Sequence, residues 1–433
     1  MTAIGSYRAQ LGNKPFRRYF IGESVSSVGD AMTDITIVML AIDLLPADER
    51  PMGIAVAAGA YLIPSMVSGV LMARRIGGLS GRTMLLVDNV WRGALLGLVA
   101  LLAVMDSLSF TWCAVLLAMS SVTRPLNGTG ARAIVRDLAP EGQLFAANSL
   151  VGLAVQSASL IGPVTAGFLC AWFGPGLALG LDALSFLFFA GSLLLIPRAA
   201  VTRRPKATDR TMGGDAEPVP DPEPAKAKAM GVLGSLRVPG IGALFGLTAV
   251  FYLLYGPFVV GLPLMAEERS FGLSTGSALG ILWSAFGLGA VVGGVVAGRF
   301  TGLAQVRIAA LSAAGWGVAM FIVAMPVHYY VALLAMFLGG LSYAPYGPIV
   351  STVMQRELPP AQLNEVSSYY GSMTSVASPL GTFAGGAAVG LLGASNSILT
   401  VGVVLAAVGV LISFMARQKK SEVTDYSMSG SAG

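Results

Sequence analysis

Charged side chains are scarce in this sequence, and the residue types that build most catalytic and metal sites are nearly missing. Only 11% of the 433 residues are charged, and the chain has one histidine and two cysteines. Cys113 and Cys170 have no CxxC motif or histidine partner, so the sequence indicates neither a disulfide nor a metal site. His328 stands at an expected helix end, where a solvated ring is the simpler interpretation. No cofactor is expected, and the basic residues form no patch suited to nucleic acid.

Long apolar runs fill most of the chain instead. Residues 53–72, for example, contain no Asp, Glu, Lys or Arg, and about 20 helical residues suffice to cross a bilayer. The runs are continuous and do not alternate, which favours helices over a membrane barrel. Twelve such stretches are expected: 19–43, 52–73, 84–105, 109–131, 144–172, 177–197, 240–264, 275–298, 306–326, 329–353, 364–391 and 394–416. The predicted fold class is therefore an all-α membrane protein with twelve transmembrane helices in two pseudo-symmetric six-helix bundles.

Basic residues are distributed unevenly between the two sides of these spans. Of the 27 Lys and Arg residues, 23 fall in the termini and loops of one side, and only Arg50 and Arg269 fall on the other. By the positive-inside rule, both termini are cytoplasmic. We expect a multi-pass protein of the cell membrane, either a plasma or an inner membrane, that acts as a monomer in the bilayer.

The chain divides into two similar halves. Residues 1–197 are expected to form the first bundle and 239–416 the second, with a Pro- and charge-rich cytoplasmic linker at 198–238 and a disordered cytoplasmic tail at 417–433. One set of loop residues recurs 225 positions later: Gly69, Ala73, Arg74 and Arg82 match Gly294, Gly298, Arg299 and Arg307. A second match relates Arg136-Asp137-Leu138 to Arg356-Glu357-Leu358. These repeats indicate an internal duplication, which is typical of rocking transporters.

Ionisable residues inside the spans are candidates for function, because burying a charge at mid-membrane costs at least about 2.5–3.5 kcal/mol. Asp30 and Asp34 are four residues apart on the first span, so they share one helical face, and Glu23 lies further along that face. Two close carboxylates resist ionising together, which suits a proton carrier. The alternative is that Asp30 caps or pairs near a helix kink after Gly29.

The other intramembrane charges lie in spans three, four and six. Arg124 precedes Pro125 and is expected at a bend. Asp88 and Arg92 are also four residues apart, and a local ion pair is the preferred interpretation. Asp182 is expected to hydrogen-bond a neighbouring helix. Spans seven to twelve carry no such charge away from their ends, so the first half is expected to handle protons.

Taken together, these features resemble the major facilitator superfamily, and within it the macrolide-efflux and enterobactin-exporter branch of proton-coupled pumps. The resemblance covers residues 16–416 and is carried by FRRYFIGESVSSVGDAMTDITIVMLAIDLL, ARAIVRDLAPEGQLFAANSLVGLAVQSASLIGPVTAG and GPFVVGLPLMAEERSFGLSTGSALGILWSAFGLGAVVGGVVAGR. It implies that Arg124 tunes a nearby carboxylate; a fixed ion pair between spans one and four is the compatible alternative.

The resemblance also assigns gating residues. The family's loop after span two usually reads Gly-x-x-x-Asp-Arg-x-Gly-Arg-Arg, and here Gly69, Arg74 and Arg82 match while Ala73 replaces the acidic residue. Arg299 is the second-half equivalent of Arg74. Gly162-Pro163 resembles the Gly-Pro-x-x-Gly-Gly signature of antiporters, for which ordinary tight helix packing is the alternative.

The function implied is export of a lipophilic or amphiphilic small molecule in exchange for protons. Import or facilitated passage of a small nutrient or organic anion is the alternative, whereas no DDxxD, HExxH or GxSxG set supports a membrane enzyme. Asp34 and Arg124 are candidate substrate contacts. Aromatic side chains of the second half are further candidates, with packing as the alternative: Tyr252, Tyr255, Trp283, Tyr346 and Tyr369.

Overall fold

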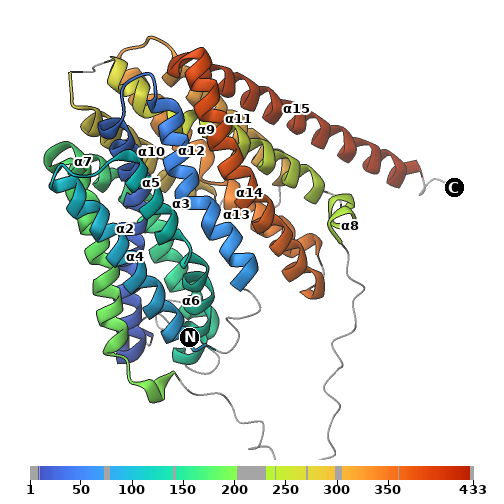
Figure 1. Cartoon of the computed structure of the whole chain (residues 1–433). Helices are drawn as coiled ribbons and strands as arrows, with labels where there is room; N and C mark the ends of the chain where they lie inside the picture. The colour runs from blue at the N-terminus through green and yellow to red at the C-terminus, as the bar shows by residue number, and fades with distance from the viewer. Residues whose placement is uncertain are drawn as a thin grey trace, which may run out of the picture. The chain divides into compact units, whose positions relative to one another are not determined.

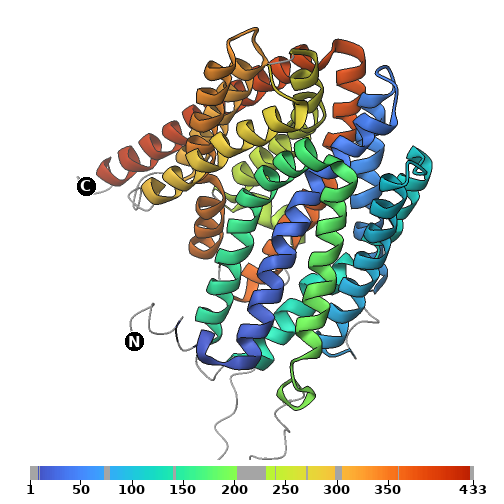
Figure 2. The same cartoon turned by 90° about the vertical axis from the view of Figure 1, so that its left-hand side faces the viewer.

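The computed structural model describes residues 8, 10–72, 79–139, 143–201, 231–238, 240–269, 272–297, 305–358 and 360–429. Apart from a 3-10 turn at Arg198–Ala200, all regular elements in these ranges are α-helices (Figures 1 and 2). They are α2 (Lys14–Leu44), α3 (Arg50–Met72), α4 (Gly81–Val104), α5 (Phe110–Ser121), α6 (Arg124–Leu138), α7 (Leu144–Leu194), α8 (Gly231–Arg237), α9 (Ile241–Arg269), α10 (Thr275–Ala297), α11 (Gln305–Ala324), α12 (Tyr329–Tyr343), α13 (Tyr346–Glu357), α14 (Pro360–Leu392) and α15 (Ala394–Ser429).

The helices confirm the predicted all-α membrane fold. Ten candidate spans in the described ranges are long and apolar enough to cross a membrane. One of them, in α7, contains two of the predicted spans, because Gly174 has a φ of 80° and is followed by Pro175. Glycine reaches this left-handed region readily, and proline cannot continue a helical hydrogen-bond ladder. The structure is thus consistent with twelve crossings.

The fourth and tenth predicted spans are each divided into two helices. α5 ends before Thr123, and α6 begins with Pro125 in its first turn. α12 ends before Pro345, and α13 follows it directly. Proline lacks the backbone donor that a continuous helix needs, so both spans break at a proline. The equivalent breaks agree with the internal duplication.

The chain forms two compact units whose boundaries differ from the predicted halves. Unit 1 comprises Met1–Leu40 and Ala60–Lys226, and unit 2 comprises Ala41–Gly59 and Ala227–Gly433. In unit 1, α4 packs against α5, α6 and α7. A core of buried side chains joins α2, α4 and α7 through Phe16, Leu85 and Phe189.

Unit 2 includes the end of α2 and the beginning of α3. Arg50 forms an ion pair with Glu267 of α9 at 2.5 Å. Ala55 is fully buried, and a Cβ placed on Gly386 of α14 would lie 2.6 Å from its Cβ. The close approach of small residues explains why residues 41–59 group with this unit.

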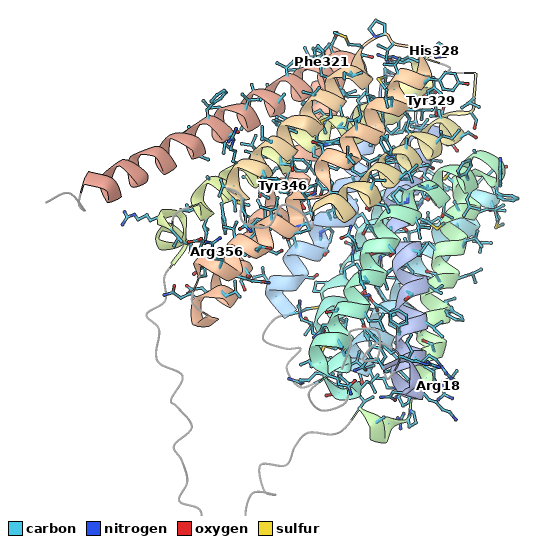
Figure 3. All side chains as sticks on the ribbon, turned by 180° about the vertical axis from the view of Figure 1, so that it is seen from behind. Arg18, Phe321, His328, Tyr329, Tyr346 and Arg356 are labelled. Carbon is cyan, nitrogen blue, oxygen red and sulfur yellow. The ribbon has the colours of Figure 1, made fainter. Side chains whose placement is uncertain are left out.

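The ends of the unit 2 helices follow local capping rules. His328 precedes α12 and is exposed, as expected for a solvated ring at a helix end, and its side chain also accepts a hydrogen bond from the Tyr330 amide. Figure 3 shows His328 and Arg356 at opposite ends of the α12–α13 segment. α15 continues to Ser429, so residues 417–429 are helical where a disordered tail was expected.

Candidate functional site

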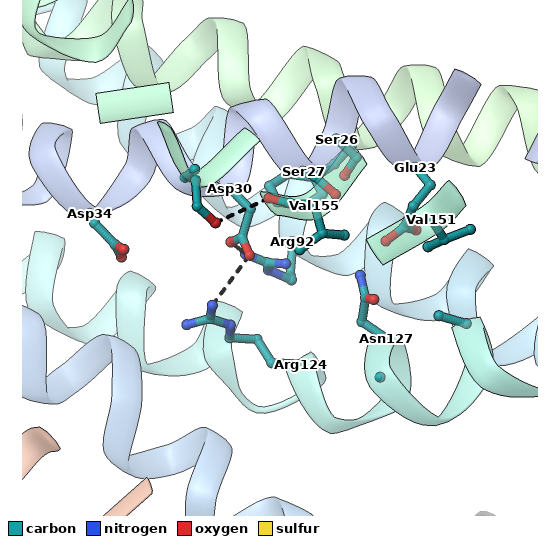
Figure 4. A pocket seen from close by; sticks show the side chains of 15 residues that line it. Glu23, Ser26, Ser27, Asp30, Asp34, Arg92, Arg124, Asn127, Val151 and Val155 are labelled. Carbon is teal, nitrogen blue, oxygen red and sulfur yellow. Dashed lines mark hydrogen bonds and ion pairs between the residues drawn. The ribbon is translucent and has the colours of Figure 1, made fainter. Parts of the chain in front are cut away.

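A cavity of about 470 Å³ lies within unit 1, and one face of α2 supplies most of its charged wall. Glu23, Asp30 and Asp34 all line it, as the shared helical face predicted, with Ser26 and Ser27 between them (Figure 4). The opposite walls come from α4, α6 and α7. Their lining residues are Arg92, Arg124, Asn127, Gly128, Ala131, Val151, Val155, Ser159 and Phe186.

Asp30 is the centre of a charged network that joins four helices. Its carboxylate forms ion pairs with Arg92 of α4 and with Arg124 of α6, the latter at 3.3 Å. The Tyr61 hydroxyl of α3 donates a hydrogen bond to Asp30 Oδ1 at 2.9 Å. Two guanidinium groups and a phenol thus hold one carboxylate, which favours its ionised form. Of the alternative that Asp30 caps or pairs, the ion pairs agree with pairing, whereas α2 continues through this position and has no end there for Asp30 to cap.

Arg92 is the more deeply buried of the two arginines. Its side chain is 1% exposed, and its guanidinium lies over the Phe186 ring at 4.1 Å from the centroid. The local pair expected with Asp88 exists, but at 3.9 Å it is secondary to the contact with Asp30. Sequence spacing identified the partner on the same helix and missed the closer partner on α2, because only tertiary packing decides which helices face each other.

Asp88 is oriented by a residue at the break between α5 and α6. It is fully buried, and its Oδ1 accepts a hydrogen bond from Thr123 Oγ1 at 2.7 Å. Its Oδ2 and the Nε of Arg92 have no hydrogen-bond partner within the described residues. The side chains of Asp88 and Arg92 therefore face each other with unused hydrogen-bonding capacity.

Asp34 and Glu23 lie on either side of this network along α2. Asp34 is exposed in the cavity, and no hydrogen bond or ion pair to it is found within the described ranges. Glu23 is 7% exposed, and its Oε2 has no hydrogen-bond partner among the described side chains. Neither carboxyl group is neutralised by a direct contact, in contrast to Asp30.

Asp182 of α7 contacts α2, as the sequence predicted. The hydroxyl groups of Thr33 and Ser185 both donate to it, and the side chain is 1% exposed. A Cβ placed on Gly29 would lie 2.2 Å from Asp182 Oδ1, so glycine is needed for this approach. Its two hydroxyl donors are neutral, and it lacks an arginine in direct contact within the described residues.

Carboxyl groups outnumber cations in this region. Five carboxyl groups, those of Glu23, Asp30, Asp34, Asp88 and Asp182, share it with the two guanidinium groups of Arg92 and Arg124. Unpaired charges are strongly disfavoured in an apolar surrounding. The arrangement can therefore hold protons on the carboxyl groups that lack a counter-ion. Within the described residues, no group of acidic, histidine or cysteine side chains is arranged to bind a metal ion.

Of the gating residues predicted at the cytoplasmic loops, the structure describes Gly69 and Arg82. A Cβ placed on Gly69 would lie 3.4 Å from Pro125 Cγ of α6. Arg82 donates to the Leu193 carbonyl at 2.9 Å, which satisfies the end of α7. Arg74 and Arg299 lie outside the described residues. A role in gating stays a prediction for all four.

The antiporter-like motif lies against the charged face of α2. A Cβ placed on Gly162 would be 2.5 Å from the Ala31 Cβ and 3.0 Å from the Val28 carbonyl. Pro163 follows within α7. The contact point is therefore adjacent in sequence to Asp30, which the spacing of the motif alone did not reveal.

The aromatic candidates belong to unit 2, where most of them surround Phe251. Tyr255 and Tyr346 stack on this ring with centroid distances of 6.0 and 5.8 Å, and Tyr252 packs edge-on at 5.9 Å. Trp283 contacts Phe258 at 6.3 Å. Tyr369 lies apart from this cluster and donates to Glu365 at 2.7 Å. Substrate contact stays a prediction for these residues.

Tyr61 and Asn127 are site residues that the sequence analysis missed. Tyr61 is 1% exposed, bonds to Asp30 and lies under the Arg124 guanidinium at 4.5 Å from the ring centroid. Asn127 lines the cavity two residues after Pro125. An uncharged side chain inside an apolar run carries little signal, although a tyrosine hydroxyl in a span needs a partner.

Comparison with known proteins establishes the family. Residues 20–382 and 277–428 match the model of the Major Facilitator Superfamily, so the chain belongs to this superfamily of multi-pass membrane transporters. An uncharacterized MFS-type transporter, y4rN, of Sinorhizobium fredii is 24% identical over 273 residues. The match covers 62% of this chain and 63% of that relative, hence less than two thirds of its length.

Solved structures share the fold. The nucleoside transporter NupG matches with a TM-score of 0.69 and 12% identity, covering 94% of this chain and 98% of that one. A bacterial homologue of the lysosomal transporter Spinster, inward-facing and unoccupied, matches with a TM-score of 0.64 and 14% identity, covering 92% of this chain and 96% of that one. A bacterial homologue of the iron transporter ferroportin matches with a TM-score of 0.62 and 17% identity, covering 92% of this chain and 98% of that one. Secondary transport is thus supported by the family, and these neighbours inform only the fold.

Proposed function

We propose that this transporter exports a lipophilic or amphiphilic small molecule in exchange for protons, by alternating access. The observation that carries the proposal is the cavity face of α2, where Asp30 is paired with two arginines and Asp34 has no direct partner. A membrane carboxyl group without a counter-ion is favoured in its neutral form. Asp34 is therefore the proton-binding group at rest, and Asp30 is the paired anion in the same state.

Arg124 connects the two carboxyl groups. Its side chain is 24% exposed in the cavity and holds Asp30 at 3.3 Å, which is long for a charge-assisted hydrogen bond. Asp34 is one helical turn away from Asp30, about 6 Å along the axis. When Asp34 loses its proton, Arg124 can turn toward it and leave Asp30. Proton release and cargo binding then compete for the same guanidinium.

The close contact of α7 with α2 supports antiport. Gly162 and Pro163 form the segment that approaches Ala31, next to Asp30. Proline removes one helical hydrogen bond and makes this point of α7 pliant. Movement of α7 at this point would shift the helix that carries the proton-binding pair. In this proposal Glu23 passes protons between the cavity and its cytoplasmic side.

The nature of the cargo is inferred from the aromatic side chains of unit 2. Tyr252, Tyr255 and Tyr346 combine flat apolar rings with hydroxyl groups, and such surfaces suit amphiphilic compounds. Inward proton flow supplies about 2.3 kcal/mol per 100 mV for each charge, in addition to the pH gradient. This is enough to drive several-fold accumulation against a gradient of cargo.

Import or facilitated passage of a nutrient or organic anion is the second candidate. It is favoured by the partial exposure of Arg124 in the cavity, since a guanidinium can bind a carboxylate or phosphate in bidentate fashion. In that case the substrate anion would replace Asp30 as the partner of Arg124, and a proton gradient would promote uptake.

The test uses purified protein in liposomes with an imposed pH gradient. Ethidium and a dansylated drug serve as amphiphilic probes and fluorescein as an organic anion. We expect the amphiphilic probes to move against the proton flow, and Asp34→Asn to abolish this movement, because an amide cannot release a proton. Movement only of fluorescein, along with the protons, would instead establish the second candidate.

A matched variant controls for the loss of a carboxyl group as such. Asp106 lies in an exposed turn with a φ of 51°, a conformation that asparagine tolerates well. Asp106→Asn should transport ethidium at the wild-type rate. Normal proton-driven transport by Asp34→Asn would remove Asp34 from the mechanism.

A further inference from the structure

Arg92 has two carboxylates within reach, and it hydrogen-bonds to only one of them. Its Nη2 bonds to Asp30 and to the Tyr61 hydroxyl, whereas its Nη1 lies 3.9 Å from Asp88 Oδ2. A distance of 3.9 Å exceeds that of a hydrogen bond. Asp88 Oδ2 and Arg92 Nε are both buried without a hydrogen-bond partner in the described part of the chain. Such a pair of unused groups in one buried cluster needs an explanation.

The two carboxylates near Arg92, Asp88 and Asp30, lie on different helices. Asp88 and Arg92 are both on α4, so their distance changes only with the rotamer of the arginine. Asp30 is on α2, so that contact opens whenever α2 moves against α4 or Asp30 takes up a proton. Thr123 fixes Asp88 Oδ1 and leaves Oδ2 directed at the guanidinium.

We infer that Asp88 is a reserve counter-ion, which receives Arg92 while Asp30 carries the transported proton. In the first state Asp34 is protonated, and Asp30 binds both Arg92 and Arg124. In the second state the O–H bond of Asp34 is broken and one on Asp30 is formed, Arg124 pairs with Asp34, and Arg92 pairs with Asp88. The number of protons and the net charge are the same in both states. Asp88 is thus a positioning residue, and the inference rests on the proposed function for its place in the transport cycle.

The physical need for such a group follows from the burial of Arg92. A guanidinium that is 1% exposed is strongly disfavoured when its only carboxylate becomes neutral. The Phe186 and Tyr61 rings near it, at 4.1 and 5.8 Å, offer weaker cation–π contacts and cannot replace a counter-ion. Without Asp88, Asp30 could not accept a proton at ordinary pH.

A stability cycle tests the reserve role without any transport. Unfolding is followed with a thiol-reactive dye, because Cys113 and Cys170 are buried and react only in the unfolded protein. Asp30→Asn and Asp88→Asn each leave Arg92 one carboxylate, and the double variant leaves none. The double variant should lose about 5 °C of apparent Tm beyond the sum of the single losses. Additive losses would overturn the inference, and pairing Asp30→Asn with Asp106→Asn gives the additive control.

The pH profile of transport tests whether Arg92 moves from Asp30 to Asp88. The titratable or charged groups facing Asp88 and Arg92 are Glu23 and Asp30 of α2, Tyr61 of α3, Arg124 of α6 and Asp182 of α7. All of them are unchanged in Asp88→Asn. Since Arg92 would then stay on Asp30, proton-driven ethidium transport should require a pH lower by about half a unit or more.

The two tests separate this inference from the proposed function. If Asp88→Asn transports ethidium more slowly but with an unshifted pH profile, Asp88 has only a structural role, and the inference is overturned. Absence of proton-driven transport in the wild-type protein would instead contradict the proposed function, while the stability cycle would still decide whether Arg92 depends on both carboxylates. Thr123→Val, which frees Asp88 Oδ1 but keeps its charge, should give a smaller shift in the same direction.

Discussion

At the scale of single residues, the site depends on two arginines with different surroundings. Arg92 is enclosed by an aromatic ring and two carboxylates, and it is 1% exposed. Arg124 is 24% exposed and holds Asp30 through one contact at 3.3 Å. A buried charge must keep a counter-ion, so Arg92 can exchange only between the two buried carboxylates, whereas a partly exposed charge can also meet a substrate. We therefore assign a structural and positioning role to Arg92 and a substrate-exchanging role to Arg124.

Conservative substitutions should separate these roles. Arg92→Lys keeps the charge but loses the planar group that stacks on Phe186 and reaches two carboxylates, so it should lower the free energy of unfolding by about 2 kcal/mol. Arg124→Lys should lower it by less than about 1 kcal/mol and yet reduce proton-driven ethidium transport about ten-fold. Thermal unfolding and liposome transport measure the two effects. Equal loss of stability in both variants would contradict the distinction.

At the scale of helices, the position of α7 against α2 determines how close the charged groups come. Glycines lie at close contacts of the two helices, for example where Gly162 meets Ala31 and where Gly29 meets Asp182. Glycines at such contacts let helices pack without a side chain between them. The contact also explains why a motif that is ordinary on pattern alone is placed next to the proton-binding pair.

Two glycines of the same helix offer a matched comparison. A side chain at Gly162 would meet Ala31 at 2.5 Å, whereas nothing lies within 4 Å of a Cβ at Gly152. Gly162→Val should reduce ethidium transport about ten-fold, because overpacking of this kind costs about 1–3 kcal/mol. Gly152→Val carries the same change in helix propensity and should transport at the wild-type rate. If both variants behave alike, the close approach of α7 is not needed for transport.

The sequence predicted the helices well, because length and hydrophobicity are local properties. All twelve expected spans begin within about five residues of an observed helix start or of the Gly174 kink. The break of span four at Thr123 was expected only as a bend at Arg124 and Pro125. The partner of Arg92 was not predicted, since Asp88 lies on the same helix and Asp30 is 62 residues away in sequence. Such pairings depend on which helix faces oppose each other, and periodicity alone does not determine that.

At the scale of the whole molecule, the distribution of basic residues predicts the orientation in the membrane. Leu79 and Ser107 flank α4, whose 24 residues span about 36 Å and therefore place them on opposite sides of a bilayer. Leu79 neighbours the basic segment that contains Arg82, so it should face the cytoplasm, and Ser107 should face outward. In intact cells a membrane-impermeant maleimide should label Ser107→Cys and leave Leu79→Cys unlabelled, while permeabilised cells should show both. Cys113 and Cys170 are 1% and 6% exposed, so the wild-type chain provides the unlabelled background. The opposite pattern would place both termini outside and contradict the orientation predicted from the basic residues.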